Sequence, residues 1–310
     1  MIKTIISSEL PVGEMFLIRK NIIRGGNGGK RLCIVTGTHG DELEGQMVCY
    51  EMARLLQEQD ERLDGTVEIY PALNPLGIDT MQRGIPNFDL DMNRIFPGDK
   101  NGTMAEQTAY TIVEDLKGAD LVIDIHSSNL YLRETPQVRI NVKDEEMLVP
   151  MARRLGVDFI WVHDAATVLE ATLAHSLNST GTPCLVVELG VGERINHKMC
   201  RNLVDGILNL MHSMGMWAGD NATGDCGESI VCKGDRVAFL NAEASGVFLT
   251  EQKCGVWVRK GDEVGIIVEP LTGKCLSHVL SPCNGYMFTI RAYPIVYEGS
   301  LMARIYQSEL

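Results

Sequence analysis

The stretch that decides the fold is RLCIVTGTHGDELEG, residues 31–45. It opens with four apolar residues, 32–35, a length and composition typical of a buried strand. Glycines at positions 37 and 40 end this strand, and an apolar pattern with helical spacing follows at about residues 43–56. His39 and Glu42 lie between strand and helix. Because open α/β sheets bind ligands at the carboxyl ends of their strands, both side chains are candidate site residues.

A second stretch has the same character. Residues 119–128, ADLVIDIHSS, form another apolar strand with His126 at its carboxyl end. Imidazole nitrogen and carboxylate oxygen are ligands that zinc accepts, and a catalytic zinc needs three protein ligands and an open fourth position. His39, Glu42 and His126 meet that count, so the sequence predicts one Zn2+ per chain. The alternative interpretation is a polar turn and a hydrogen-bonded strand end.

Five motifs occur in order along the chain: GTHGDE at 37–42, NP at 74–75, MNRIFPG at 92–98, DIH at 124–126 and ELG at 188–190. Together they resemble the succinylglutamate desuccinylase/aspartoacylase family of the zinc carboxypeptidase superfamily. The resemblance implies an α/β fold, with a mixed, mostly parallel sheet flanked by helices, and zinc-dependent hydrolysis of amides. Met92 stands where the family usually has leucine, which is a conservative change.

Glu188 is the candidate general base. It is a lone charge at the end of the apolar run 184–187 and is followed by glycines at 190 and 192. Burial of a carboxylate there would be costly unless the group were paired or used in catalysis. The resemblance supports the base role, in which Glu188 takes a proton from water and returns it to the leaving amine. The alternative is a strand-end carboxylate that faces solvent.

The resemblance assigns further roles around the metal. Asn93 and Arg94 match the residues that bind the substrate carboxylate, and the planar guanidinium suits such an anion. Arg83 is implied to polarise the scissile carbonyl and to stabilise the oxyanion, with an exposed loop arginine as the alternative. Asp124 lies two residues before His126 on the same strand, so both share one face. It is a candidate hydrogen-bond partner that fixes the tautomer of a ligand histidine.

Strands alternating with helices over residues 31–216 predict one catalytic unit, 1–219, whose sheet is covered on both faces. A capping box of Thr103 and Glu106 predicts a helix at 103–117. Residues 220–228 are rich in Gly, Asp and Asn and are predicted to form a linker. The long stretch 76–103 is predicted to be an irregular, functional loop.

Residues 229–310 contain short apolar runs separated by glycine turns, which predicts a small all-β domain. This domain resembles a biotinyl/lipoyl-like barrel, through residues 255–268 and 281–285. Lys274 is near the position of a carrier lysine but lacks the usual sequence context, so a structural role of the barrel is favoured over attachment of biotin or lipoate.

The composition restricts the partners. A formal net charge of −13 argues against nucleic acid or an anionic membrane as the main partner. The first 14 residues do not have the pattern of a signal peptide, and no segment approaches the length of a membrane span. Nine cysteines without a CxxC pair predict reduced thiols in a cytoplasmic protein. A homo-oligomer remains open.

The favoured function is therefore a zinc-dependent deacylase that cleaves the amide bond of a small N-acyl amino acid or related N-acyl amine. The first alternative is a metallocarboxypeptidase acting on short peptides, which would share the metal chemistry and differ in access to the site. The second alternative is a zinc-binding protein without turnover. It is disfavoured because ligands, base and arginines occur together.

Overall fold

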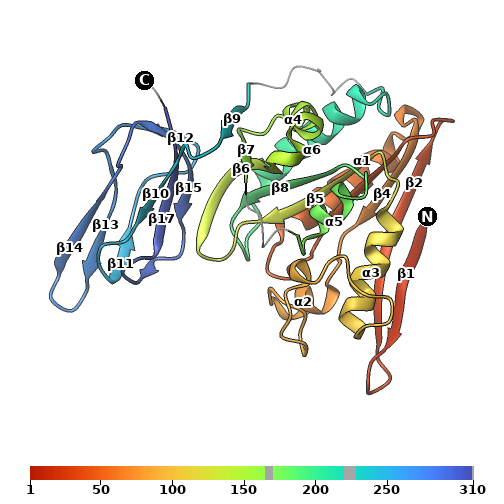
Figure 1. Cartoon of the computed structure of the whole chain (residues 1–310), viewed down its shortest axis with the longest axis horizontal. Coiled ribbons are helices and arrows are strands. Elements are labelled where there is room, and N and C mark those ends of the chain that lie inside the picture. Colours follow the sequence, from red (N-terminus) through yellow and green to blue (C-terminus); the bar gives the residue numbers. More distant parts are fainter. Residues whose placement is uncertain (165–169, 220–227, 309–310) are drawn as a thin grey trace.

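The computed structural model describes residues 1–164, 170–219 and 228–308. Figure 1 shows a large sheet flanked by helices, with a set of strands at one end of the molecule. The large sheet has the strand order β1-β2-β4-β3-β5-β8-β6-β15-β17-β10, with β12 beside β15, β7 beside β6, and β9 beside β7. A second sheet has the order β14-β13-β11-β16.

The strands are β1 (Ile2–Glu9), β2 (Met15–Gly25), β3 (Arg31–Thr36), β4 (Gly65–Tyr70), β5 (Leu121–Ser127), β6 (Leu132–Asn141), β7 (Phe159–His163), β8 (Cys184–Gly190), β9 (Ile230–Lys233), β10 (Val237–Asn241), β11 (Gly246–Leu249), β12 (Val256–Val258), β13 (Glu263–Glu269), β14 (Lys274–Leu280), β15 (Gly285–Arg291), β16 (Ile295–Val296) and β17 (Leu301–Gln307). The helices are α1 (Glu44–Glu58), α2 (Pro75–Thr80), α3 (Met104–Leu116), α4 (Glu145–Arg154), α5 (Leu173–Asn178) and α6 (His197–Ser213), with short 3-10 turns η1 (Asp60–Arg62), η2 (Met92–Arg94) and η3 (Val142–Asp144).

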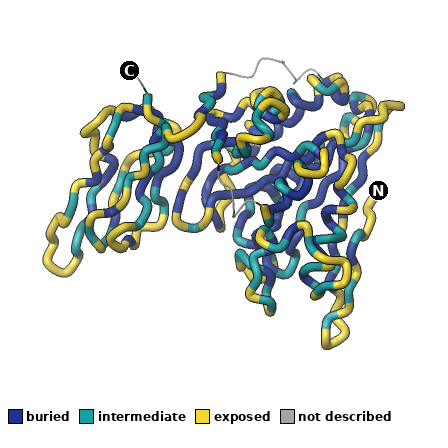
Figure 2. Tube along the Cα trace, in the orientation of Figure 1, coloured by how far each residue is buried: buried dark blue, intermediate teal, exposed yellow. Residues whose placement is uncertain are grey.

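The centre of the sheet confirms the predicted fold class. Strands β4, β3, β5 and β8 run parallel, while β2 joins β4 and β6 joins β8 in antiparallel fashion. Leu32 and Ile34 of β3 pack into one core, and Cys33 and Val35 pack into the other. This alternation explains why β3 is apolar throughout: both of its faces are buried. Figure 2 shows the deepest burial along these central strands.

Helices cover both faces of the sheet. Val48, Met52 and Leu56 follow one another at four-residue intervals on α1, so they form one apolar stripe that packs into the same core as α4 and α6. Helices α3 and α5 pack into the opposite core. The predicted capping box is confirmed: Thr103 accepts from the backbone of Glu106, and the Glu106 carboxylate accepts from the backbone of Thr103.

The amino terminus forms a hairpin of β1 and β2. One local prediction needs correction. Residues 76–103 were predicted to be irregular, yet they contain most of α2 and the turn η2. Helix α2 begins because Pro75 occupies its first turn and Asn74 caps it by accepting a hydrogen bond from the Gly77 N–H.

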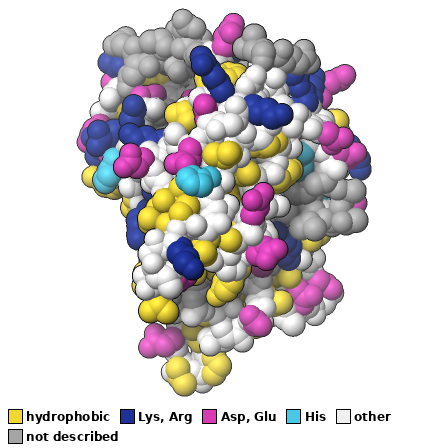
Figure 3. Space-filling view, turned by 90° about the vertical axis from the view of Figure 1, so that its left-hand side faces the viewer, with side chains coloured by type: hydrophobic (Ala, Val, Ile, Leu, Met, Phe, Trp, Pro, Cys, Tyr) yellow, Lys and Arg dark blue, Asp and Glu magenta, His cyan; other side chains and the backbone are white. Residues whose placement is uncertain are grey.

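The C-terminal region is all-β, as predicted, with its own core between the two sheets. The large sheet also continues into it, because β15 pairs with β6 and brings Thr289 opposite Glu134. The predicted linker lies outside the described residues except for Glu228. Figure 3 shows the face formed by this end of the molecule, where hydrophobic side chains are interspersed with charged ones. Within the described part of the chain, no helix is long and apolar enough to cross a membrane.

Candidate active site and metal centre

The loop after β3 is shaped by close backbone packing. Gly37 has a φ of +69°, a conformation that glycine adopts without strain. A Cβ atom at Gly40 would lie 1.9 Å from the carbonyl carbon of Gly77, so only glycine fits there. Gly77 in turn donates its N–H to Asn74, 3.0 Å away. The NP motif thus forms the surface against which the turn carrying His39 and Glu42 packs.

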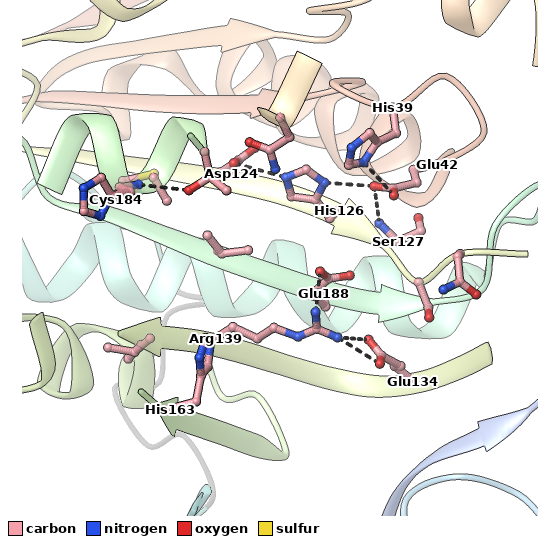
Figure 4. A pocket seen from close by; sticks show the side chains of 18 of the residues that line it. His39, Glu42, Asp124, His126, Ser127, Glu134, Arg139, His163, Cys184 and Glu188 are labelled. Carbon is pink, nitrogen blue, oxygen red and sulfur yellow. Dashed lines mark hydrogen bonds and ion pairs between the residues drawn. The ribbon is translucent and has the colours of Figure 1, made fainter. Parts of the chain in front are cut away.

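The three predicted metal ligands converge. Nδ1 of His39 lies 2.8 Å from Oε1 of Glu42, and Nδ1 of His126 lies 2.9 Å from Oε2 of the same carboxylate. One donor atom from each side chain can be chosen so that all lie within 4.8 Å of one another, and all three residues are buried. The backbone N–H of Ser127 donates to Oε2 of Glu42 over 3.1 Å, which fixes the carboxylate between the two rings. Figure 4 shows this convergence.

Electrostatic interactions shift the pKa values of His39, Glu42 and His126 in the directions that favour their ion pairs. Burial would lower the pKa of His126, but the charges of Asp124 and Glu42 raise it well above its ordinary value. The pKa of His39 is raised in the same way, because Glu42 and Asp91 outweigh burial. Burial alone would raise the pKa of Glu42, and the two histidines bring it below its ordinary range. The direction of each shift therefore favours ion pairing of the Glu42 carboxylate with the two rings.

Two further carboxylates lie behind the histidines. Asp91 Oδ1 lies 3.0 Å from Nε2 of His39, and the same oxygen accepts the Asn93 N–H over 2.8 Å. Asp124 Oδ2 lies 3.1 Å from Nε2 of His126, at an angle that does not make a hydrogen bond. The sequence predicted Asp124 and missed Asp91. The only sequence feature that pointed to Asp91 was its position directly before the MNR motif. Loops have no regular spacing of apolar residues, so the contact between Asp91 and His39 could not be inferred from the sequence.

The donor set fits zinc. Two imidazoles and a carboxylate are ligands that zinc prefers in catalytic sites, and carboxylates behind the histidines are a common feature of such sites. Metal binding requires neutral imidazoles and an ionised carboxylate, so any proton that the rings carry would be released to solvent. The buried oxygens of Asp124 have no hydrogen-bond partner among the described residues.

Arg83 lies against the ligand carboxylate. Its NH1 donates to Oε1 of Glu42 over 3.0 Å, and its Nε lies 3.4 Å from Oδ2 of Asp91. The loop that carries it is held in place by the Gly40 N–H, which donates to the carbonyl of Gln82 over 3.0 Å. The structure therefore places Arg83 against Glu42 and Asp91.

Glu188 lies on the strand next to His126. Strands β5 and β8 are parallel, and His126 is directly opposite Glu188 in their register, so both side chains project from the same face. Burial raises the pKa of Glu188 to about 7, while the charge of Arg139 opposes that shift. NH1 of Arg139 lies 3.1 Å from Oε1 of Glu188. The side chain is thus mostly buried, paired on one side, and accessible to the cavity.

The network of charged side chains behind Glu188 was not predicted from the sequence. NH2 of Arg139 donates to both oxygens of Glu134, over 2.9 and 2.8 Å. NH1 of Arg304, from the C-terminal strand β17, donates to Oε1 of the same carboxylate over 2.7 Å. Glu134 is fully buried and balances both guanidinium groups. These residues meet only because β6 pairs with β8 and with β15, and such pairing is not readable from local sequence.

Asn93 and Arg94 also line the cavity. Oδ1 of Asn93 accepts the N–H of Leu173, at the start of α5, over 3.0 Å, which leaves Nδ2 as its donor toward a ligand. Arg94 donates to the Asn93 carbonyl over 2.7 Å and makes no ion pair with any described residue. Arg94 is therefore the lining arginine whose charge is not already balanced by a carboxylate.

Gly190 of the ELG motif has a structural role. Gly190 has a φ of +70°, and a Cβ atom there would lie 1.9 Å from Oε1 of Glu44. The buried Glu44 carboxylate accepts the Val191 N–H over 3.1 Å and a hydrogen bond from Ser127 Oγ. This carboxylate links the end of β8 to the end of β5, beside both His126 and Glu188.

Most of these side chains line one cavity of about 560 Å³. His39, Glu42, His126 and Glu188 are among its lining residues, as are Arg83, Asn93, Arg94 and Asp124. The structure therefore brings the site residues predicted from the sequence together around the same cavity.

Known proteins resemble this chain in sequence and in fold. Residues 28–214 match the model of the succinylglutamate desuccinylase/aspartoacylase catalytic domain. The N-alpha-acetyl-L-2,4-diaminobutyric acid deacetylase of Halomonas elongata is 24% identical over 276 residues, which cover 86% of this chain and 79% of that protein.

Solved structures agree with this match. A succinylglutamate desuccinylase/aspartoacylase from Rhodobacter sphaeroides superposes with a TM-score of 0.81 and 25% identity, over 98% of this chain and 95% of that one. The product-bound ectoine utilization protein EutE (DoeB) from Ruegeria pomeroyi has a TM-score of 0.81 and 21% identity, over 97% and 93%. The family model covers more than half of the chain, and the chain belongs to the succinylglutamate desuccinylase/aspartoacylase family.

Proposed function

We propose that this protein is a zinc-dependent hydrolase that removes the acyl group from a small N-acyl amino acid. The observation that carries the proposal is the register of β5 and β8, which sets Glu188 directly beside His126 over one cavity that Arg94 also lines. A metal ligand, a candidate base and an unpaired cation thus face the same space. The related deacetylase of Halomonas elongata supports the same class of reaction.

His39, Glu42 and His126 would hold the zinc ion. When bound, zinc supplies a Lewis acid and lowers the pKa of a water molecule to about 7. The chain's own residues orient the ligands, transfer the proton and bind the substrate. The Ser127 N–H and the Asp91 carboxylate keep Glu42 and His39 oriented, and the Asp124 carboxylate lies 3.1 Å from Nε2 of His126.

Glu188 serves as the proton carrier. With a pKa raised to about 7 by burial, its carboxylate can accept a proton from the attacking water near neutral pH and then donate it to the leaving amine. Arg139 holds one oxygen of Glu188 in place. In the hydrolysis, the carbonyl carbon gains the oxygen of water and the C–N bond breaks. The amine leaves with the proton that Glu188 transfers.

The arginines bind negative charge. Arg83 lies against Glu42, where its guanidinium can stabilise the charge that develops on the scissile carbonyl oxygen. Arg94, helped by Nδ2 of Asn93, binds the carboxylate of the amino acid. Because Arg304 of the C-terminal strand β17 lines the same cavity, the C-terminal region limits the length of the substrate. This favours a small N-acyl amino acid over the peptides of a carboxypeptidase.

The test is a hydrolysis screen with zinc-loaded protein. N-acetyl, N-formyl and N-succinyl amino acids are compared with short peptides and with N-acyl amines that lack a carboxylate. We expect turnover of N-acyl amino acids and much slower cleavage of peptides.

Arg94→Ala sharpens this screen. It should lower kcat/KM mainly for substrates with a free carboxylate, and Arg133→Ala is the matched control, since Arg133 is exposed and does not line the cavity. Peptides cleaved faster than every N-acyl amino acid would overturn the proposed substrate class. Equal loss on substrates with and without a carboxylate would remove Arg94 as the carboxylate-binding residue.

A further inference from the structure

The large sheet continues into the C-terminal region, and one row of side chains crosses the junction. Glu134 of β6 is opposite Thr289 of β15, and Thr289 is opposite Arg304 of β17. Residues opposite one another in a sheet project from the same face, so the three side chains lie side by side. The family model ends at residue 214, so two members of this row lie outside the part of the chain that it matches.

Glu134, at one end of this row, accepts hydrogen bonds from three side chains. NH2 of Arg139 donates to both of its oxygens over 2.9 and 2.8 Å, and NH1 of Arg304 donates to Oε1 over 2.7 Å. The hydroxyl of Thr289 donates to the same oxygen over 3.4 Å. Glu134 is fully buried, and a buried carboxylate is costly without such partners. Its position therefore depends on both arginines.

Both guanidinium groups also lie over the ring of Trp161 on β7. The distance from the ring centroid to the central guanidinium carbon is 5.8 Å for Arg139 and 5.7 Å for Arg304. Such contacts are attractive, and they restrict the positions that the two planar groups can take. Residues of β6, β7, β15 and β17 thus hold the two arginines around Glu134.

Arg139 connects this arrangement to the candidate base. Its NH1 lies 3.1 Å from Oε1 of Glu188, while its NH2 is bound to Glu134. Figure 4 shows the guanidinium group between the two carboxylates. Gln137 is directly opposite Glu188 in the register of β6 and β8, yet its buried amide has no hydrogen-bond partner among the described residues. Arg139 is therefore the side chain that fixes the carboxylate of Glu188.

The charges of this network balance when all four groups are present and Glu188 is ionised. Arg139 and Arg304 carry two positive charges, and Glu134 and Glu188 carry two negative ones. Without Arg304, both carboxylates would depend on the single guanidinium group of Arg139. The side chain of Glu134 is 1% exposed against 14% for Glu188, and it binds Arg139 through both oxygens. Glu134 would therefore keep Arg139, and Glu188 would lose its fixed position.

We propose that Arg304 is a positioning residue for catalysis, which acts through Glu134 and Arg139 to fix the carboxylate of Glu188 beside the metal site. This rests on the proposed deacylase function, in which Glu188 transfers the proton. The C-terminal strands then complete the catalytic machinery in addition to limiting the length of the substrate. A direct contact of Arg304 with the substrate is the alternative that the experiments distinguish, since this side chain also lines the cavity.

The first test compares zinc-loaded Arg304→Ala with wild type. We expect kcat to fall by ~10–100-fold, because a displacement of about 1 Å can cost ~10²-fold in rate, while KM and zinc content stay near wild type. Arg304→Lys should recover most of kcat, because the hydrogen bond to Glu134 comes from one nitrogen, NH1. Arg236→Ala is the matched control and should keep the wild-type kcat. It removes a guanidinium group that lies 5.3 Å from the ring of Tyr306 on β17 and that does not line the cavity.

A double-mutant cycle separates positioning from a merely structural role. If Arg304 acts through Glu188, Arg304→Ala should leave the residual turnover of Glu188→Gln almost unchanged. An equal fold-loss of kcat in the wild-type and Glu188→Gln backgrounds would overturn the proposal. So would an Arg304→Ala enzyme that keeps the wild-type kcat, whether its KM is unchanged or raised.

Crystal structures of the zinc-loaded variants give a readout that does not need turnover. Arg139 and Glu188 should stay paired in wild type and in Arg304→Lys, and they should separate in Arg304→Ala. A pair that persists in Arg304→Ala would overturn the proposal. A wild type that cleaves no N-acyl substrate, while the pair still depends on Arg304, would reject the deacylase function and keep the positioning of Glu188.

Discussion

Two buried charged clusters lie on the same face of the sheet and differ in how their polar atoms are satisfied. The metal-site cluster lies at the carboxyl ends of β3 and β5. The Lys20 cluster lies closer to the start of β3, under the end of α3. The metal-site cluster consists of His39, Glu42, Asp91, Asp124 and His126. The Lys20 cluster consists of Lys20, Arg31, Glu68, Tyr70 and Asp115.

The Lys20 cluster is closed on itself. Lys20 Nζ donates to Glu68, Tyr70 and Asp115 over 2.9, 3.0 and 2.7 Å, which uses all three of its protons. The metal-site cluster instead leaves both oxygens of Asp124 and Nε2 of His126 without a hydrogen bond among the described residues. A saturated buried cluster stabilises the fold, whereas one with unsatisfied groups is arranged for a ligand. The two clusters should therefore respond oppositely to mutation.

The largest expected effect comes from His126→Ala. A three-ligand site has no spare ligand, so zinc should fall from about one per chain to near zero. Turnover should fall by more than the ~10–100-fold that loss of a residue behind a ligand costs. Metal analysis and kcat measurement check this, and circular dichroism should show a folded protein. Full zinc occupancy in both His39→Ala and His126→Ala would reject the metal site.

Lys20→Met should have the opposite profile. It leaves the carboxylates of Glu68 and Asp115 buried without their main cation, which typically costs ~3–5 kcal/mol. Urea unfolding should show this loss of stability, while zinc content and kcat/KM of the folded protein stay near wild type. Loss of zinc with unchanged stability would mean that the two clusters are not separable in this way.

Local patterns in the sequence predicted the metal-site cluster better than the Lys20 cluster. Each of the four site residues follows an apolar strand segment, so it could be identified from the sequence next to it. These residues are His39, Glu42, His126 and Glu188. Asp91 lies in a loop, where no periodicity reports contact.

The residues that the sequence missed depend on strand pairing. Lys20 meets Glu68 because β2 pairs with β4, and Arg304 meets Glu134 because β17 lies beside β15, which pairs with β6. Register sets these contacts, and a one-residue shift would turn every side chain to the other face. The fold class was predictable from alternating strands and helices, but the continuation of the sheet into the C-terminal region was not.

Asp91→Asn should have a smaller effect than loss of a ligand. It removes the charge that orients His39 and keeps a similar shape, so zinc affinity or activity should fall by ~10–100-fold. Competition with a chelator measures the affinity. Asp89→Asn is the control, because that neighbouring carboxylate makes no hydrogen bond or ion pair with His39, whereas Asp91 makes both. Equal zinc affinity and kcat in Asp91→Asn and wild type would exclude a role in orienting the ligand.

The smallest effect concerns pH and the Lys20 cluster. Burial would raise the pKa of Glu68, but hydrogen bonds from Lys20 and Tyr70 bring it below its ordinary value. A lowered pKa contributes stability above the unfolded value of about 4.3, and that stability is lost as pH falls through the folded pKa. The stability difference between wild type and Lys20→Met should therefore shrink between pH 7 and pH 3.5. A difference that grows on acidification would contradict the assignment.

The most direct test of the central claim is Glu188→Gln, with metal content and turnover measured on the same sample. The three metal ligands are untouched and the substitution keeps the shape of the side chain, so about one zinc per chain should remain. Proton transfer is lost, so kcat should fall by at least ~10²–10⁴-fold, with little change in substrate affinity. A Glu188→Gln enzyme that keeps its zinc and turns over near the wild-type rate would contradict the account.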